Sequence, residues 1–265
     1  MGLRGLMPLV FAVTSGLALA GVPGPASLNA WSAYALATEA RVERELRDGT
    51  RFLALDFAGR DRRALLAGEA VVTGRAIDVP SAMVHHWTGA ILIPGVQLDA
   101  LMQSLQRDVP DTGQPDVLAT RVLGRGADTM TVFLKIQRSR FVTAVFNTEH
   151  RVQFRQFGPG RAFSASTATK IAELDSPGTP QERELPPGQD RGFLWRWNAY
   201  WRYERVGGAG LSGVEGVIVE CESLSLSRGV PFGLRTLVGP LINSTARESM
   251  VRTLTSMRAH FRKSG

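Results

Sequence analysis

The chain of 265 residues has little of what most catalytic and metal sites are built from. Its only cysteine, Cys221, excludes an intramolecular disulfide and any metal site made of several thiolates. Four histidines are present, and the adjacent His85 and His86 fall on an expected strand, where neighbouring side chains point to opposite faces. We find no helical His-x-x-x-His spacing, nucleophile elbow, phosphate loop or dinucleotide fingerprint. The sequence therefore predicts neither a metal nor a cofactor.

Long apolar runs are also scarce, and the one that stands out is at the N-terminus. Arg4 is followed by mostly apolar or small residues up to Ala20, with an interruption at residues 14–16. This run is short for a membrane-spanning helix and is typical of a secretory signal peptide with cleavage after Ala20. An uncleaved anchor is the open alternative. We expect a periplasmic or secreted protein.

Charge of one sign is not concentrated anywhere in the chain. The formal net charge is +7, but the 31 basic residues are spread along the sequence and form no dense run interleaved with aromatic residues. This distribution predicts a solvated basic surface and no nucleic-acid partner. Weak contact with an anionic membrane surface stays open.

Apolar periodicity and turn residues divide the chain into strands and helices. Strands are predicted at 51–57, 69–79, 84–93, 117–123, 129–137, 140–157, 161–174, 193–204 and 216–226, and helices at 29–47, within 60–66, and at 98–105 and 245–261. Serial strands joined by short turns, with helices at the ends, predict an α+β fold with an antiparallel meander. The proline-rich segment 175–191 is interpreted as a surface loop, with a lid as the sharper alternative.

Two strands near the C-terminus alternate with period two and predict one apolar, aromatic face and one charged face. Glu220 and Glu222 lie on the charged face, where we expect Arg196 and Arg202 to pair with them across strands. Such a salt-bridged ladder is preferred to a pair of catalytic carboxylates. The aromatic face is predicted to carry Trp195, Trp197, Ala199, Trp201, Tyr203, Val217, Val219 and Cys221.

The C-terminal segment predicts a long amphipathic helix. Its apolar residues recur at helical spacing from residue 245 onward, with Thr245 and Glu248 at the separation of a capping box. A second apolar cluster at 234–242 precedes it, and Pro240 predicts a break between the two. The apolar stripe comprises Met250, Leu254, Met257 and Phe261.

Residues 84–94, the Trp-rich strand, residues 220–228 and the region 234–258 together resemble the START-like helix-grip superfamily, also called SRPBCC, which includes polyketide cyclase-like proteins. The resemblance covers about residues 80–261. It implies a curved antiparallel sheet that grips a long C-terminal helix, with a cavity between them for lipids, sterols, polyketides or other apolar molecules. We divide the chain into a signal peptide (1–20), an N-terminal helix with lead-in strands (29–80) and a START-like domain (81–265).

The function predicted from this arrangement is an exported binding protein for an apolar small molecule or lipid. The alternatives are a cyclase- or hydrolase-type enzyme on the same scaffold, using a cavity His150, His85 or Glu149, and a structural domain bound to a membrane through a basic helix face. A solid core without a void also stays open. The predicted ligand-binding residues are Trp195, Trp197, Trp201, Tyr203, Val219, Met250, Leu254, Met257 and His150.

Overall fold

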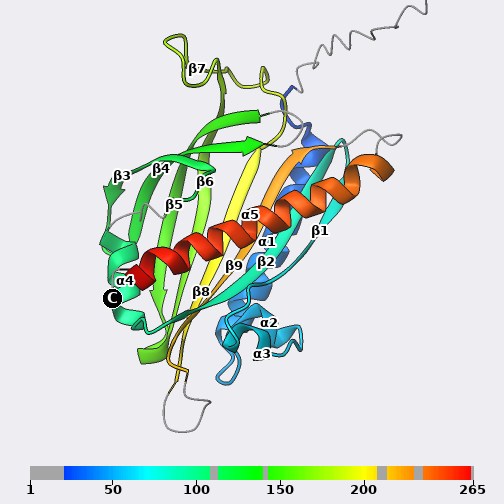
Figure 1. Ribbon diagram of the computed structural model, residues 1–265. Coiled ribbons are helices and arrows are strands. Elements are labelled where there is room, and N and C mark those ends of the chain that lie inside the picture. The colour runs from blue at the N-terminus through cyan, green and yellow to red at the C-terminus, as the bar shows by residue number, and fades with distance from the viewer. Residues whose placement is uncertain (1–20, 108–112, 140–142, 208–213, 230–234, 264–265) are drawn as a thin grey trace, which may run out of the picture.

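The computed structural model describes residues 21–107, 113–139, 143–207, 214–229 and 235–263, and only the backbone of 139, 235–243 and 263. A curved antiparallel sheet crosses the whole molecule, with α5 lying across its concave face and α1 behind it (Figure 1). The predicted α+β helix-grip arrangement is confirmed. The segment 1–20 lies outside the described residues, so the expected signal peptide stays a prediction.

The sheet contains nine strands in the order β1-β2-β9-β8-β6-β5-β4-β3, with the two-residue β7 paired to β6. Their bounds are β1 Val71–Val79, β2 Ala82–Pro94, β3 Val117–Arg125, β4 Thr129–Ser139, β5 Thr143–Gln156, β6 Arg161–Asp175, β7 Arg183–Glu184, β8 Arg196–Val206 and β9 Gly216–Arg228. The helices are α1 Pro25–Leu46, α2 Ala54–Phe57, α3 Arg63–Leu66, α4 Leu98–Arg107 and α5 Arg235–Lys263. Among these elements, no described helix combines the length and apolarity needed to span a bilayer.

The β8–β9 hairpin has the register that the alternation predicts. Trp201 pairs with Cys221 and Tyr203 with Val219, so both partners of each pair share the concave face. Arg202 pairs with Glu220 on the opposite face, as expected. The second expected pair is wrong, because Arg196 lies opposite Leu226 and Glu222 lies opposite Tyr200.

The C-terminal helix is one continuous element, which corrects the predicted break at Pro240 and the predicted start at Thr245. Pro240 lies in the second turn of α5, where its missing N–H removes one intrahelical hydrogen bond while the following turns continue. The side chains of the expected cluster at 234–242 lie outside the described residues. Farther along, Met250 and Leu254 contact β2 at Gly89, where the missing Cβ lets the helix approach the sheet closely.

Helix α1 covers the convex face of the middle strands. Its apolar residues join a cluster with Leu224 and Leu226 of β9 and Val84 of β2. The same cluster holds Phe52 and Leu53 from the segment that leads into α2. Both faces of the sheet are therefore covered by helices along part of their length.

The strand predicted at 51–57 is wrong: residues 51–53 are a loop, and Ala54–Phe57 form the short helix α2. The carboxylate of Asp56 accepts hydrogen bonds from the amides of Phe52 and Leu53, and Glu220 of β9 accepts from the amides of Ala54 and Leu55. The local bonds to Asp56 fix the chain before the helix, and the two tertiary bonds to Glu220 satisfy the first N–H groups of α2, so these contacts outweigh the strand preference of the apolar alternation.

Candidate functional site

The two faces of the central strands β8 and β9 differ in how completely they are filled. On the convex face Tyr200, Arg202, Glu220 and Glu222 are all buried beneath α1 and the segment around α2. On the concave face Ala199, Tyr203, Val219 and Cys221 are buried, but four other residues of β8 and β9 keep part of their surface accessible, although they lie in the middle of the sheet on the side that α5 crosses. These half-exposed residues are Trp197, Trp201, Ser223 and Ser225. The concave face therefore carries accessible surface at a place where a fully packed core would carry none.

An aromatic pair forms the centre of this exposed area. The rings of Trp197 and His150 meet edge to face, with centroids 4.9 Å apart. The indole Nε1 of Trp197 donates a hydrogen bond to the hydroxyl of Ser223 over 3.1 Å. Because β5, β8 and β9 each contribute one of these residues, three strands fix the orientation of the indole.

His150 is buried and neutral. Burial lowers the pKa of its imidazole from 6.5 to about 4. The hydroxyl of Thr148 donates its proton to the carbonyl of Leu134 and so accepts a hydrogen bond from Nε2 of His150, at 3.0 Å. Nδ1 is then the acceptor for the hydroxyl of Ser166, at 3.3 Å. With both nitrogens engaged, the ring acts as a support for Trp197, and this geometry does not favour a general base.

One guanidinium lies beside the aromatic pair. Arg138, at the end of β4, is stacked 5.4 Å from the ring centre of Trp197. Its Nη1 lies 3.6 Å from a carboxylate oxygen of Asp116 and 3.4 Å from the hydroxyl of Ser249 on α5. The same oxygen of Asp116 lies 3.5 Å from Arg252, also on α5. This polar cluster joins the concave face of β4 to the middle of α5.

Arg138 combines a partly desolvated charge with accessible surface. Burial lowers the pKa of its guanidinium, which the negative charge of Asp116 only partly offsets. Yet 38% of the side-chain surface is accessible. The guanidinium is therefore not sealed off by its protein neighbours and keeps surface that another molecule can contact. We call the area around Arg138, Trp197, Trp201 and Ser223 the concave hollow.

Most of the predicted ligand-binding residues lie on the concave side, but several fill the contact between helix and sheet. Met250 and Leu254 are buried in a cluster with Trp87, Ile91 and Cys221, while Met257 is buried with Tyr203 and Val219. Trp201 borders both clusters. The C-terminal half of α5 is thus held against the sheet by direct apolar contacts.

Trp195 is placed on the wrong face by the alternation. It precedes β8 and lies in the cluster beneath α1, with Leu224 and Leu226. Asp190 accepts hydrogen bonds from the amide of Gly192 and from the indole Nε1 of Trp195, and these bonds turn the indole away from the concave face. Gly192 has a φ of +74°, so the chain reverses locally before the strand begins and the period of two does not extend back to Trp195.

The other candidate acid–base residues lie apart from His150. His85 contacts the hydroxyl of Ser227 at 2.8 Å, and His86 bridges Glu222 and Tyr34 on the convex side. Glu149 is partly exposed and lies 3.8 Å from Lys170 on the outer surface. Within the described residues, no group of three or more His, Cys, Asp or Glu side chains is placed to hold a metal ion.

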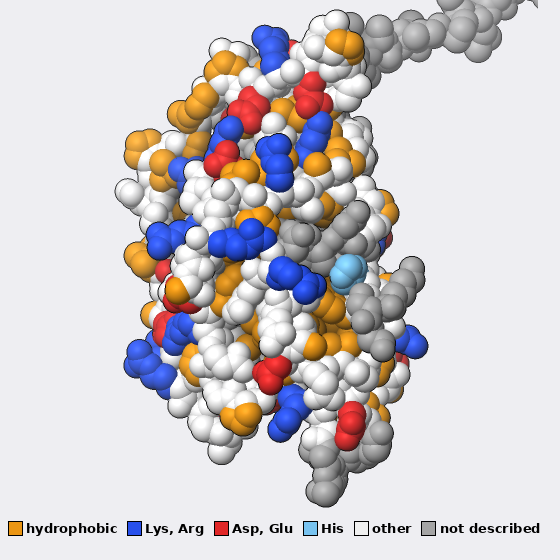
Figure 2. Space-filling view, turned by 90° about the vertical axis from the view of Figure 1, so that its left-hand side faces the viewer, with side chains coloured by type: hydrophobic (Ala, Val, Ile, Leu, Met, Phe, Trp, Pro, Cys, Tyr) orange, Lys and Arg blue, Asp and Glu red, His pale blue; other side chains and the backbone are white. Residues whose placement is uncertain are grey.

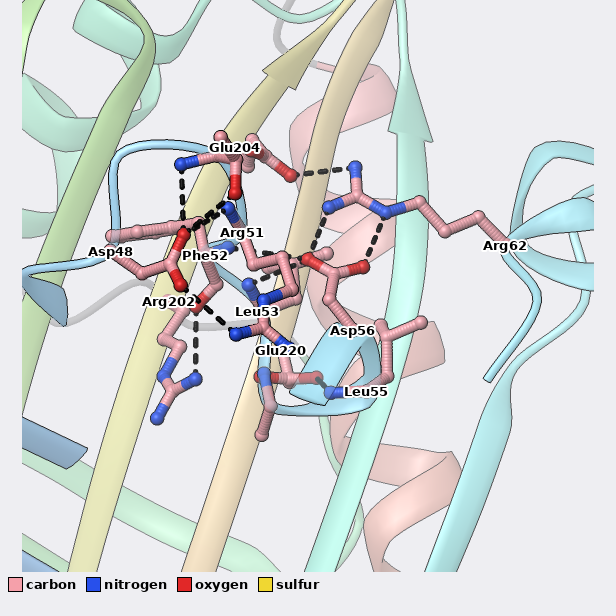
Figure 3. A network of polar contacts seen from close by, with 12 residues as sticks. Asp48, Arg51, Phe52, Leu53, Leu55, Asp56, Arg62, Arg202, Glu204 and Glu220 are labelled. Atoms are coloured by element: carbon pink, nitrogen blue, oxygen red, sulfur yellow. Dashed lines mark hydrogen bonds and ion pairs between the residues drawn. The ribbon is translucent and has the colours of Figure 1, made fainter. Parts of the chain in front are cut away.

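The carboxylate pair of β9 belongs to a buried ionic network on the convex side, part of which is shown in Figure 3. Arg202, only 1% exposed, donates to Glu45 of α1 and to the carbonyl of Phe52. Burial raises the pKa of Glu220 to about 7, against the opposing effects of Arg202 and the two α2 amides. For Glu222, burial also raises the pKa, but hydrogen bonding by His86 and the charge of Arg41 outweigh it and hold the pKa below its usual value.

A pocket of about 110 Å³ lies on this side, between α2 and the strands β1, β2 and β9, with Glu220 in its wall. Its lining is otherwise mostly small, with Ala54, Ala58 and Ala90. Both oxygens of Glu220 accept amide hydrogen bonds from the start of α2, so the carboxylate is committed to holding that segment. The network therefore fastens α1 and α2 to the sheet.

Sequence reasoning missed the polar cluster of the concave hollow, namely Arg138, Asp116, Thr148, Ser166, Ser223, Ser249 and Arg252. One signal was available in β4, where Met130, Val132, Leu134 and Ile136 occupy alternate positions and Arg138 continues the same alternation. A charge at the end of an apolar face is a place to look for function, because an uncompensated buried charge is costly.

Comparison with known proteins gives matches only among solved structures. No protein-family model matches the chain, and no curated protein matches it in sequence. The STAR-related lipid transfer protein of Xanthomonas axonopodis is 17% identical, with a TM-score of 0.45 over 71% of this chain and 98% of that one. The Zhui aromatase/cyclase of Streptomyces sp. R1128 is 10% identical, with a TM-score of 0.43 over 68% and 94%. The lipid transfer and protein localization domain of human StarD13 is 7% identical, with a TM-score of 0.43 over 80% and 98%.

Proposed function

We propose that this chain is an exported binding protein for an apolar small molecule or lipid, held between the concave face of the sheet and α5. One observation carries the proposal: the convex face of β8 and β9 is filled, whereas part of their concave face, at Trp197, Trp201 and Ser223, keeps accessible indole and hydroxyl surface, next to the accessible guanidinium of Arg138 on β4. Indole surface and hydroxyl groups next to apolar walls are typical of sites for small apolar ligands with a few polar groups.

The driving force for binding would be burial of apolar surface. Transfer of such surface from water contributes about 25 cal/mol per Å². Trp197 and Trp201 each retain accessible indole surface that a guest would cover. Because three strands hold Trp197 in place, the site loses little side-chain entropy when a guest binds.

A blocking variant tests the proposal. Ala168 of β6 lies opposite His150 and shares its face, while Thr167 next to it is exposed on the other face. We expect Ala168→Phe to lower the affinity for a dansyl-labelled fatty alcohol by at least about tenfold, because the ring occupies space beside Trp197. Thr167→Phe is the matched control and should leave the affinity within about twofold. Equal affinities in the two variants would contradict a guest in the concave hollow.

Extraction of the protein purified from its native source provides an independent test. Mass spectrometry of the solvent extract should reveal a bound apolar molecule in stoichiometric amount. The same preparation tests export, since the mature chain should begin near Gly21. An intact Met1 would contradict cleavage without affecting the binding proposal.

Weak contact with an anionic membrane surface belongs to the same proposal. Leu118 and Leu123 are exposed, and both lie at bulges of the edge strand β3, with Arg121 and Arg125 on the same strand. Figure 2 shows the side of the molecule where β3 lies, with Lys and Arg side chains spread over it and apolar atoms between them. Exposed leucines beside arginines suit an interface with anionic lipid. Salt-sensitive sedimentation with phosphatidylglycerol vesicles, lost in Leu118→Ser/Leu123→Ser, is the expected result.

A further inference from the structure

The charges around the concave hollow do not balance. Arg138 and Arg252, of which Arg252 also contacts solvent, contribute two positive charges, and Asp116 contributes one negative charge. His150 is neutral, and the buried Glu173 nearby on β6 is paired with its own partner, Arg191. Among the described residues around the hollow, one positive charge is therefore left over.

The single carboxylate is shared loosely between the two guanidinium groups. Its oxygen lies 3.6 Å from Arg138 and 3.5 Å from Arg252, whereas the Asp56–Arg62 and Glu204–Arg161 pairs elsewhere in the chain are at 2.7 and 3.0 Å. Burial raises the pKa of Asp116, but the charge of Arg252, a hydrogen bond from Gln114 and the charge of Arg138 together outweigh it and hold the pKa below its usual value, so the carboxylate stays ionised. Asp116 thus holds both arginines in place without neutralising either one fully.

The guanidinium of Arg138 is the group best placed to receive a counter-ion. It is stacked on Trp197, which is fixed by Ser223 and supported by His150, and its side chain keeps 38% of its surface accessible. A stacked guanidinium keeps its planar edge for paired N–H donation to a carboxylate. The apolar indole surface of Trp201 continues from this point toward α5.

We propose that the concave hollow binds an apolar molecule carrying one carboxylate, with Arg138 as the counter-ion of the carboxylate and the apolar part lying along Trp197 and Trp201. This inference rests on the proposed function and adds the chemical class of the guest. It distinguishes a monoanionic ligand from the neutral lipids and alcohols that the same apolar surface would accept.

The test compares two probes that differ only in charge, dansyl-labelled undecanoic acid and its methyl ester, measured by fluorescence titration. Wild-type protein should bind the acid about tenfold more tightly than the ester, as expected for one charge-assisted hydrogen-bonding pair. Arg138→Met keeps the approximate length of the side chain and removes the charge. It should lower the affinity for the acid about tenfold and leave the affinity for the ester within about twofold of the wild-type value. Arg151→Met, which makes the same charge change at an exposed position of β5, is the control and should change neither affinity.

The outcomes separate the two proposals. Equal binding of acid and ester by the wild type overturns the carboxylate and leaves the binding function standing. If neither probe binds, the binding function itself fails. If Arg138→Met still binds the acid more tightly than the ester, another group binds the carboxylate, and the role proposed for Arg138 is overturned.

A second variant keeps the test valid if Arg138→Met does not fold. Asp116→Asn removes the competing carboxylate while keeping the shape of the side chain, so the acid should bind several-fold more tightly and the ester should be unaffected. Unchanged or weaker binding of the acid by Asp116→Asn contradicts the proposal.

Discussion

The contact between α5 and Gly89 makes the helix-grip arrangement directly testable. A Cβ at position 89 would lie 2.5 Å from Cγ of Met250 and 2.9 Å from Cδ1 of Leu254. Ordinary van der Waals contact begins at 3.4 Å, so the helix or its side chains must move by roughly 1 Å to admit one methyl group. Cγ of Met250 is not the free end of a flexible chain, and movement of Leu254 disturbs a residue that is fully buried.

We therefore expect Gly89→Ala to lower the free energy of unfolding by about 1–3 kcal/mol, the usual cost of overpacking. The control is Gly124→Ala, another glycine within a strand, where a Cβ would meet nothing within 4 Å. This control should be neutral or stabilising by up to about 1 kcal/mol, because alanine restricts the unfolded chain. Urea unfolding followed by circular dichroism gives both values.

The double variant Gly89→Ala/Met250→Ala identifies the cause. Met250→Ala alone should cost about 2–5 kcal/mol through the cavity it leaves, and the added methyl group at position 89 should recover part of that loss. A coupling energy of at least about 1 kcal/mol is expected for two residues in contact. If Gly89→Ala is as stable as the control, or if the two changes are additive, α5 does not lie against β2 as described.

Three further predictions concern the buried polar groups. Arg202→Met should destabilise the fold by about 3–5 kcal/mol in urea unfolding, because the buried Glu45 loses one of its two arginines, Glu220 loses the nearby positive charge and the carbonyl of Phe52 loses its donor. Arg196→Met, at an exposed position of the same strand, is the control and should cost less than about 0.5 kcal/mol. The pKa of His150 is lower in the folded state than in the unfolded chain, so the unfolded state binds the proton first as the pH falls. The free energy of unfolding should therefore decrease by roughly 3 kcal/mol between pH 6.5 and about 4. His150→Gln should lack this decrease, and an equal pH dependence of variant and wild type would contradict the prediction. The pKa of Glu220 is raised to about 7 in the folded state, so the folded protein keeps this proton at a pH where the unfolded chain has lost it. The contribution of Glu220 to the free energy of unfolding should therefore decline as the pH rises from 4.5 to 7. Carbon NMR of the carboxyl group should show a titration midpoint near 7, and a midpoint near 4.5 would refute the effect of burial.

The sequence predicted the strands well because a sheet with one face beneath a helix repeats its apolar residues with period two over long stretches. The four strands from β3 to β6 and the hairpin β8–β9 were each found this way, and Trp201 and Val219 were placed correctly on the concave side. Turn residues between them supplied the boundaries.

The errors arise where tertiary contacts override local pattern. The predicted strand at 51–57 gives way to a loop and the helix α2 because Glu220, far along the chain, accepts hydrogen bonds from the first two amides of α2. Trp195 does not lie on the concave face, because its indole N–H donates a hydrogen bond to Asp190 in the preceding loop. Neither partner can be read from spacing, since each lies outside the repeating segment.

The polar cluster of the concave hollow shows the same limit for the site. Asp116, Arg138 and Arg252 come from a loop, a strand and a helix, and their meeting depends on how α5 crosses the sheet. The alternation of β4 contains a signal for Arg138, a charge at the end of an apolar face, but it gives no indication of the residues that Arg138 meets.

The unequal exposure of the indole rings provides an optical signal that needs no label. Trp31, Trp87 and Trp195 are at most 8% exposed, so their emission should stay constant when the solvent or the guest changes. Trp197 and Trp201 are the half-exposed indoles, and both border the concave hollow. A guest that displaces water there should shift the emission of these two rings to shorter wavelength and shield them from iodide quenching, so the protein itself would report the occupancy of its interior.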